Sequence, residues 1–310
     1  MAFLNALPGA IAEGLIWGLM AIGVYIAYKI LDIADLTVDG SICTGGCVCA
    51  VLIAAGVPAW LSVIAAIFAG ALTGVLTGIF HTALGIPAIL SGILTQLILY
   101  SVNLSRLGSK SLLAVDPRTN VLLLNMSNNP RAILAAGLII AAVIVILRLF
   151  FYTEVGLTLK STGDNPDMSR AQGINVKLNK VIGLAIANGI VALAGALLAQ
   201  YKGSANINDG RGAIVIGLAA IFIGLSVSTR IKPNLLCSLI GVIGGGIVYY
   251  VIYNFVVLLG LKTDYLKMLS AIIVVIFLAM PYLKNEYFKK PVPEAELSSV
   301  PGSGGGDADA

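Results

Sequence analysis

Residues 35–74, DLTVDGSICTGGCVCAVLIAAGVPAWLSVIAAIFAGALTG, share their layout with residues 206–245, NINDGRGAIVIGLAAIFIGLSVSTRIKPNLLCSLIGVIGG. Each stretch has an Asp-Gly pair, then a short apolar run, then a proline, then a longer glycine-rich apolar run. The pairs are Asp39-Gly40 and Asp209-Gly210, and the prolines are Pro58 and Pro233. Short, glycine-interrupted segments in matching places predict an internal repeat of the kind that builds many transporters. The alternative is that Gly and Asp simply favour turns in a membrane protein.

The composition around these stretches is that of an integral membrane protein. The chain is 58% hydrophobic and 11% charged, whereas a soluble domain carries about 25% charged residues. A helix needs about 20 apolar residues to cross a bilayer. The sequence therefore predicts an all-α polytopic bundle with nine spans, and about eight to ten when uncertain ends are considered. They are residues 11–30, 41–57, 61–80, 87–104, 132–151, 180–200, 212–228, 234–260 and 265–283.

The direction of the two copies follows from the order of the spans. The short spans are the second and the seventh, so an odd number of crossings separates them and the copies are inverted. Inverted repeats commonly place a solute site near the midplane, where helices are broken. Glycines that recur on one face, such as Gly70, Gly74 and Gly78, predict close helix packing in lipid.

Lys and Arg favour the orientation in which residues 152–180 face the cytoplasm, since basic residues concentrate on that side. The N-terminus then lies outside and the C-terminus inside, with 11 basic residues inside against 8 outside. The inside set is Lys29, Arg148, Lys160, Arg170, Lys177, Lys180, Arg230, Lys232, Lys284, Lys289 and Lys290, and the outside set is Arg106, Lys110, Arg118, Arg131, Lys202, Arg211, Lys262 and Lys267.

Catalytic, metal and nucleic-acid sites are not predicted. The chain has one histidine and no basic patch interleaved with aromatics, and its net charge is only +4. Cys43, Cys47 and Cys49 lie close together in a short span, where we expect them to pack as small apolar residues. No reactive Ser-His-Asp or Cys-His set can be assembled.

Residues 156–180, GLTLKSTGDNPDMSRAQGINVKLNK, form the most polar long stretch between two apolar spans. Asn165-Pro166 is a helix start, because Asn caps and Pro is favoured at the first helical position. Gly173 suits the left-handed residue that closes a helix. So short a helix is marginal alone, and the simplest partner is a cleft on a soluble protein at the membrane surface.

This polar segment resembles the cytoplasmic coupling segment of ABC importer permeases of the branched-chain amino acid and monosaccharide class. Lys160 stands where the family usually has Arg, and Ser161 stands where Ala is common. The resemblance extends over most of residues 11–285, including ALAGALLAQYKGSANINDGRG and GLAAIFIG. The residues that match the pattern are Gly156, Gly163, Asp164, Asn165, Pro166, Ala171, Gly173, Ile174 and Asn175.

The resemblance implies a mechanism and its partners. Two permease chains, expected as a homodimer, form the pathway in the cytoplasmic membrane of a prokaryote, and two cytosolic ATPase subunits bind the short helices. An extracytoplasmic binding protein delivers the solute. The chain has no P-loop, so ATP and Mg²⁺ are expected in the partner ATPase, with no cofactor in this chain. The expected coupling residues are Gly156, Lys160, Gly163, Asp164, Asn165, Pro166, Met168, Arg170, Ala171, Gly173 and Ile174.

The resemblance implies an amino acid as cargo, and DLTVDGS resembles a branch of the family associated with amino acids, aromatic ones among them. A sugar or nucleoside permease is the alternative within the class, and an ion-coupled secondary carrier is the alternative outside it. Polar residues in and beside the spans are the candidates for the substrate pathway, since intramembrane polar groups are often functional. They are Asp35, Asp39, Thr95, Gln96, Asn103, Asn188, Gln200 and Asp209.

Three further expectations concern the ends and the longest loop. Residues 1–14 lack the basic n-region of a signal peptide, so the first span is expected to be retained. Residues 1–285 form the permease domain, with the coupling segment at 156–176, and residues 286–310 a disordered cytoplasmic tail. The loop 105–131 is either a docking surface for a binding protein or a connector.

Overall fold

The structure is a computed structural model that describes residues 2–108, 110–115, 122–124, 126, 129–231 and 234–258, with isolated positions beyond them. Side chains are described from residue 6 onward, apart from some positions near the end of the seventh predicted span. Most of the ninth predicted span and all of the predicted tail, residues 286–310, lie outside the described residues.

The described part of the chain is almost entirely helical. The helices are α1 Ala2–Tyr25, the π-helix η1 Ile26–Ile30, α2 Val38–Ala54, α3 Ala59–Thr82, α4 Ala88–Arg106, α5 Asn129–Phe151, α6 Glu154–Asp164, α7 Pro166–Ala171, α8 Val176–Lys202, α9 Ala213–Ile231 and α10 Leu235–Leu258. Two short strands, β1 Leu112–Ala114 and β2 Ser204–Asn206, pair antiparallel, with Leu113 opposite Ala205.

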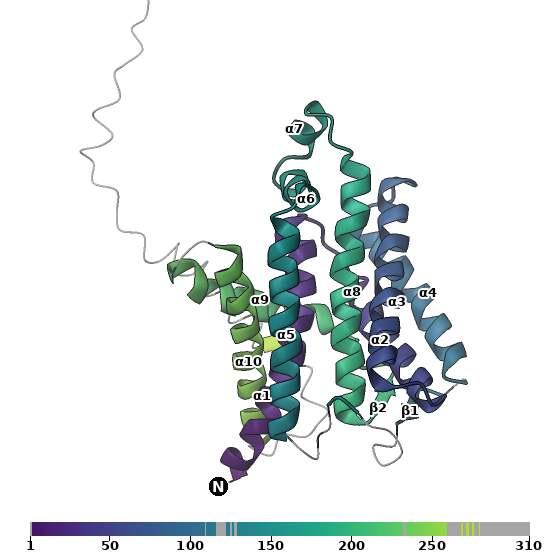
Figure 1. Cartoon of the computed structure of the whole chain (residues 1–310), viewed down its shortest axis with the longest axis vertical. Coiled ribbons are helices and arrows are strands. Elements are labelled where there is room, and N and C mark those ends of the chain that lie inside the picture. Colours follow the sequence, from purple (N-terminus) through teal and green to yellow (C-terminus); the bar gives the residue numbers. More distant parts are fainter. Residues whose placement is uncertain are drawn as a thin grey trace, which may run out of the picture.

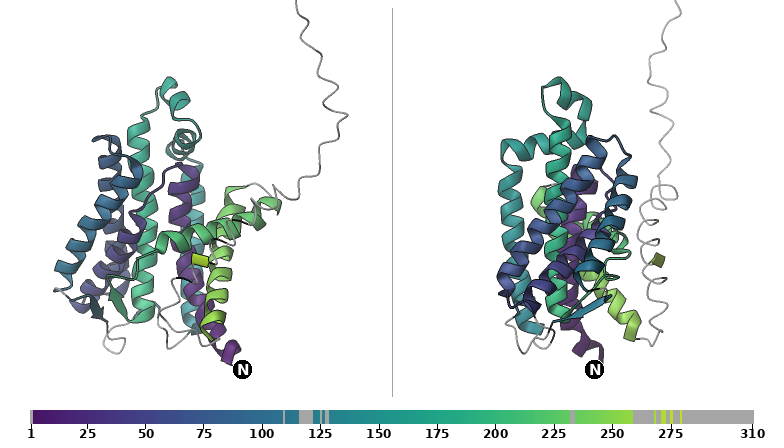
Figure 2. Two further views of the ribbon diagram at one scale, coloured as in Figure 1. Left: turned by 180° about the vertical axis from the view of Figure 1, so that it is seen from behind. Right: turned by 90° about the vertical axis from the view of Figure 1, so that its right-hand side faces the viewer.

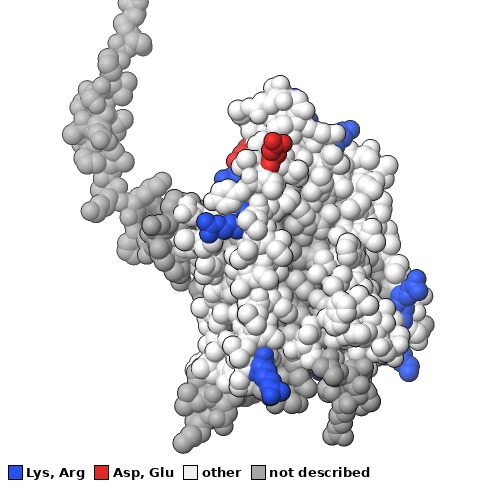
Figure 3. Space-filling view, in the orientation of Figure 1, with Lys and Arg blue, Asp and Glu red and all other residues white. Residues whose placement is uncertain are grey.

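Six of these helices are long and apolar enough to cross a membrane: α1 with η1, α3, α4, α5, α8 and α10. Most of the face drawn in Figure 3 is uncharged, and the acidic side chains visible on it lie at the end that carries α6 and α7. The polytopic helical bundle predicted from the sequence is therefore confirmed. Eight of the nine predicted spans correspond to helices of the described residues.

Helix α8 lies at the centre of the bundle, and α1, α2 and α3 pack along it (Figures 1 and 2). Its length from Ala187 to Tyr201 is buried without interruption. Small residues allow this burial, because Gly70 and Gly74 of α3 bring the two backbones into contact at Asn188 and Leu184. Close backbone approach of this kind is how helices associate in lipid.

The two ends of the bundle differ in structure. Helices α6 and α7 project together at one end, and the β1–β2 pair and the N-terminus lie at the other (Figure 1). Helix α5 runs toward the end that carries α6 and α7, and α8 runs back from it. The N-terminus thus lies opposite the polar segment, as the predicted topology requires.

The two short apolar helices, α2 and α9, both begin inside the bundle. Residues 31–37 between η1 and α2 are not helical, and Asp32 in this stretch has a left-handed backbone, with φ of 54°. Helix α2 begins at Val38, three residues earlier than predicted, so the Asp39-Gly40 pair belongs to its first turn. Asp39 therefore lies in the helix, directly after the non-helical stretch.

The glycine contacts between α3 and α8 provide a test of the packing. A Cβ at Gly74 would collide with the Leu184 carbonyl oxygen, whereas a Cβ at Gly137 of α5 would have no neighbour within 4 Å. We expect Gly74→Ala to lower the free energy of unfolding by about 1–3 kcal/mol, the usual cost of overpacking. Gly137→Ala should be neutral or stabilising. Thermal unfolding of the two purified variants in the same detergent measures this, and equal stability would contradict the packing argument.

Candidate functional site

The first turns of α2 and α9 meet through one carboxylate. Asp39 Oδ2 accepts a hydrogen bond from the Gly212 amide at 2.9 Å, and Oδ1 accepts one from the Ile214 amide at 2.9 Å. These amides belong to the start of α9, where backbone N–H groups lack intrahelical acceptors. An acidic side chain is also favoured there by the helix dipole. Asp39 therefore caps a helix that is distant in sequence.

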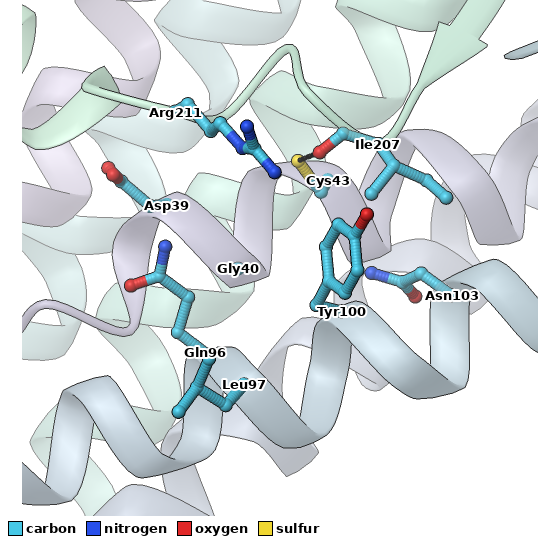
Figure 4. A pocket seen from close by; sticks show the side chains of 9 residues that line it. All are labelled: Asp39, Gly40, Cys43, Gln96, Leu97, Tyr100, Asn103, Ile207 and Arg211. Carbon is cyan, nitrogen blue, oxygen red and sulfur yellow. Dashed lines mark hydrogen bonds between the residues drawn. The ribbon is translucent and has the colours of Figure 1, made fainter. Parts of the chain in front are cut away.

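A cavity of about 340 Å³ lies beside this junction, between α2, α4 and the segment that precedes α9. It is lined by Asp39, Gly40, Cys43, Gln96, Leu97, Tyr100, Asn103, Ile207 and Arg211 (Figure 4). Its volume falls within the range of small-molecule sites, about 300–1,000 Å³. Leu97, Tyr100 and Arg211 are exposed, so the cavity opens at the surface.

Some polar side chains of this cavity are hydrogen-bonded within the protein, and others are not. The Arg211 guanidinium lies over the Tyr100 ring, 5.8 Å from its centroid. Asn103 donates to Thr44 at 3.0 Å, and the Cys43 thiol donates to the Ile207 carbonyl at 3.0 Å. Among the described residues, the Gln96 amide has no hydrogen-bond partner and Arg211 forms no ion pair. Gln96 and Arg211 are therefore available to a bound solute.

A second, smaller cavity of about 150 Å³ lies between α1, the stretch before α2 and the first turns of α4 and α9. Asp35 lines it but is engaged elsewhere: its carboxylate accepts from the Thr37 amide at 2.8 Å and from Asn188 at 2.7 Å. Asn188 also accepts from Ser41 at 2.6 Å. Apart from Asp35, the lining is apolar.

Several predicted pathway residues belong to buried interhelical hydrogen bonds. Thr95 accepts from Thr77, which also bonds Thr37. The Gln200 side chain accepts from the Leu123 amide and donates to Cys49 and to the Ala59 carbonyl. Such bonds join helices in membrane proteins.

Asp209 stands apart from that group, because it lies 3.6 Å from Lys202 in a partly buried ion pair. Of the eight candidates, Asp39, Gln96 and Asn103 line the larger cavity and Asp35 lines the smaller one. The assignment of the eight to a transport pathway stays a prediction.

The polar segment folds into two helices joined at Asn165. Asn165 Oδ1 accepts from the Asp167 and Met168 amides at 3.1 and 2.9 Å, with Pro166 at the first helical position. Gly173 has φ of 80°. The predicted α7 and its capping residues therefore lie where the sequence placed them.

Helix α6 anchors α7 to the bundle. Leu159 and Thr162 are buried, Asn179 of α8 donates to Thr162 at 3.1 Å, and Ser161 bonds Ser169 of α7 at 2.7 Å. Gly156 packs on the backbone of Phe150 and Phe151, and Gly163 packs on the backbone of Ile30, where η1 ends. Side chains larger than glycine would collide at both places.

The outer surface of α7 is left open to solvent. Met168 is 60% exposed, and Arg170 and Asp167 form an exposed ion pair at 3.2 Å. Lys160, Asp164 and Ala171 are also exposed, and Ile174 is half-buried. The outer side of α7 thus presents a methionine beside charged side chains, uncovered by the described residues.

The comparisons with known proteins agree with this architecture. Residues 8–278 match the family described as "Branched-chain amino acid transport system / permease component". This chain belongs to that family. A "Tyrosine transport system permease protein" of Clostridioides difficile is 34% identical over 276 residues, which are 89% of this chain and 91% of that one.

Two other relatives extend the comparison. An "Uncharacterized protein" of Rickettsia prowazekii is 31% identical over 91% of this chain and 99% of its own. A "Probable ABC transporter permease protein" of Escherichia coli is 27% identical over 43% of this permease and 40% of its own length. No solved structure matches the permease.

Sequence reasoning missed two cavity residues of this permease, Tyr100 and Arg211. Tyr100 lies one helical turn after Gln96 and so shares its face of α4, which is a signal that was present in the sequence. Arg211 was counted only as an outer-loop charge, although it directly precedes the second broken helix. Its partnership with Tyr100 spans more than a hundred residues, and no local pattern indicates it.

Substitution of a residue in the buried hydrogen bonds should affect stability differently from substitution of a residue that lines the cavity. Asn188→Ala removes partners from Asp35 and Ser41, and leaving buried polar groups unsatisfied costs about 1–3 kcal/mol. Gln96→Ala removes no hydrogen bond of the described residues. We expect Asn188→Ala to lower the thermal stability of the permease in detergent and Gln96→Ala to leave it unchanged. The reverse order would mean that the two side chains are misassigned.

Proposed function

We propose that this permease is the membrane subunit of an ATP-driven importer of an amino acid, and that α6 and α7 bind a cytosolic ATPase subunit. The observation that carries the proposal is the family membership together with a rigid, exposed hairpin between two spans. The permease would work with an extracytoplasmic binding protein and a second permease copy. ATP and Mg²⁺ would be bound in the ATPase, outside this chain.

The contacts of α6 support its role as the element that transmits force. Gly163 rests on the backbone of Ile30, and Gly156 rests on the end of α5. A displacement of α6 would therefore act directly on the backbone of η1 and of α5, with no flexible side chain between them. Ile30 is the last residue of η1, directly before the non-helical stretch that leads to α2.

The orientation follows from this docking. If α6 and α7 face the cytoplasm, the N-terminus and the β1–β2 pair lie outside, and the larger cavity lies on the outer side of the α2–α9 junction. Arg106 and Lys202 then face outward, as the distribution of basic residues predicts. The binding protein would approach from this side.

The proposed cargo is an amino acid with an aromatic side chain. The support is the 34% identical relative, whose name states that it belongs to a tyrosine transport system. A host strain without its own aromatic amino acid uptake, complemented with the complete transporter, should accumulate labelled tyrosine. Accumulation of ribose or a nucleoside in place of amino acids would overturn the cargo and leave the permease role intact.

The docking surface can be tested with a matched pair of methionines. Met168 of α7 is 60% exposed, and Met126 is 61% exposed in the loop before α5, outside the polar segment. We expect Met168→Glu to abolish co-purification of the ATPase subunit and uptake, because the charge would be buried without a partner in the interface. Met126→Glu should leave co-purification unchanged.

Both methionine variants should keep the parent thermal stability, since neither side chain is buried. Retention of the ATPase by Met168→Glu would contradict the docking role. Loss of the ATPase in both variants would point to a general effect of added negative charge.

A further inference from the structure

We propose that the larger cavity binds the amino acid in its zwitterionic form, with Arg211 pairing with the α-carboxylate and Asp39 attracting the α-ammonium. The inference rests on the proposed amino acid cargo. It adds which residue binds the carboxylate and which binds the ammonium group. The cavity is the one beside the α2–α9 junction, about 340 Å³ in volume.

The first observation is that two opposite charges line the same cavity without neutralising one another. Asp39 and Arg211 both line it (Figure 4), with the Asp39 carboxylate bonded to the start of α9, and they form no ion pair within the described residues. The Asp39 carboxylate accepts hydrogen bonds from two backbone amides at the start of α9, which fix its position. A carboxylate oxygen can accept more than one hydrogen bond, so Asp39 retains capacity for an ammonium group.

The second observation is the placement of the Arg211 guanidinium. Its central carbon lies 5.8 Å from the centroid of the Tyr100 ring, a cation–π contact that favours this position of the guanidinium. The N–H groups of a guanidinium lie in its plane, and two of them match a carboxylate. A cation held in this way, with no carboxylate partner in the described chain, favours an anionic group from a solute.

The third observation is the chemistry of the remaining lining. Leu97 and Ile207 provide apolar surface next to the Tyr100 ring, and the Gln96 amide has no protein partner in the described residues. An aromatic side chain packs favourably on such a surface, at a ring separation of about 4.5–7 Å. The cavity thus offers two charges, an amide and an aromatic wall, which together fit an aromatic amino acid better than a neutral sugar.

The test measures protection of a cysteine introduced at the cavity. Leu97→Cys replaces a 62% exposed lining residue, and the native Cys43, Cys47 and Cys49 are buried. Alkylation of purified full-length Leu97→Cys permease by N-ethylmaleimide is followed with and without tyrosine, and the parent protein gives the background rate. Leu138→Cys on α5, 72% exposed and outside the cavity, is the control for effects of tyrosine on the reagent.

We expect tyrosine to slow alkylation of Leu97→Cys and not of Leu138→Cys. Tyramine, which lacks the carboxylate, and 3-(4-hydroxyphenyl)propionate, which lacks the ammonium, should each need about tenfold higher concentration, the effect of losing a charged hydrogen bond. Adding Arg211→Gln should remove the advantage of tyrosine over tyramine, and Arg106→Gln, at the exposed end of α4, should preserve it. Ligand analogues test the ammonium because changing Asp39 would also remove the cap of α9.

The result that overturns the proposal is equal protection by tyrosine and tyramine, unchanged protection with Arg211→Gln, protection by ribose, or no protection by any probe. These outcomes are separate from failure of the proposed function. Tyrosine accumulation in complemented cells would still stand if protection failed, and its absence in cells would overturn the cargo whatever happens at Leu97→Cys.

Discussion

The Asp39 carboxylate and the first amides of α9 form the interaction on which the centre of this permease depends. Two helices that start within the bundle present N–H groups that no lipid can satisfy, and each unsatisfied group costs several kcal/mol. Asp39 accepts from Gly212 and Ile214 and so satisfies two of them at once. Gly210 packs directly on the Asp39 backbone, which allows the approach. The larger cavity lies beside this junction, with Arg211 and residues of α4 in its lining.

A second consequence of the broken helices is the hydrogen-bonded core between α2, α3, α4 and α8. Ser41 and Thr37 of the α2 region bond Thr73 and Thr77 of α3, and Asn188 of α8 bonds Asp35. Alternate residues of the non-helical stretch, Leu31, Ile33, Asp35 and Thr37, are therefore buried against the bundle, whereas Asp32 and Ala34 are exposed. Burial in protein is what allows irregular backbone within a membrane protein. The polar residues of the spans therefore form two groups. One group is hydrogen-bonded around the non-helical residues 31–37, and the other lines the larger cavity.

The sequence predicted the elements better than it predicted their contacts. Helix α7 was predictable because Asn165, Pro166 and Gly173 act through local backbone chemistry. Helix α6 was not predicted as a separate helix, because Gly156, Thr158 and Gly163 have low helix propensity. Its stability comes from tertiary contacts, through Leu159, Thr162 and the glycines themselves. The proposed zwitterion site also depends on tertiary contacts. Asp39 was a candidate from the sequence because it lies near a helix break, but Tyr100 and Arg211 come together only because α4 lies beside the start of α9.

The contacts also connect the two ends of the permease in a short physical path. Gly163 of α6 rests on Ile30, η1 ends there, and residues 31–37 lead directly to Asp39. Asp32, in a left-handed conformation within this path, is a strained position of the kind that concentrates where backbone rearranges. A force on α6 would therefore reach the cap of α9 through backbone, since the glycine contact and the covalent chain leave few side-chain rotamers to absorb it. The proposed ATPase surface and the proposed solute cavity are thus separated by one irregular segment, and motion of that segment would change both the α9 cap and the lining of the cavity.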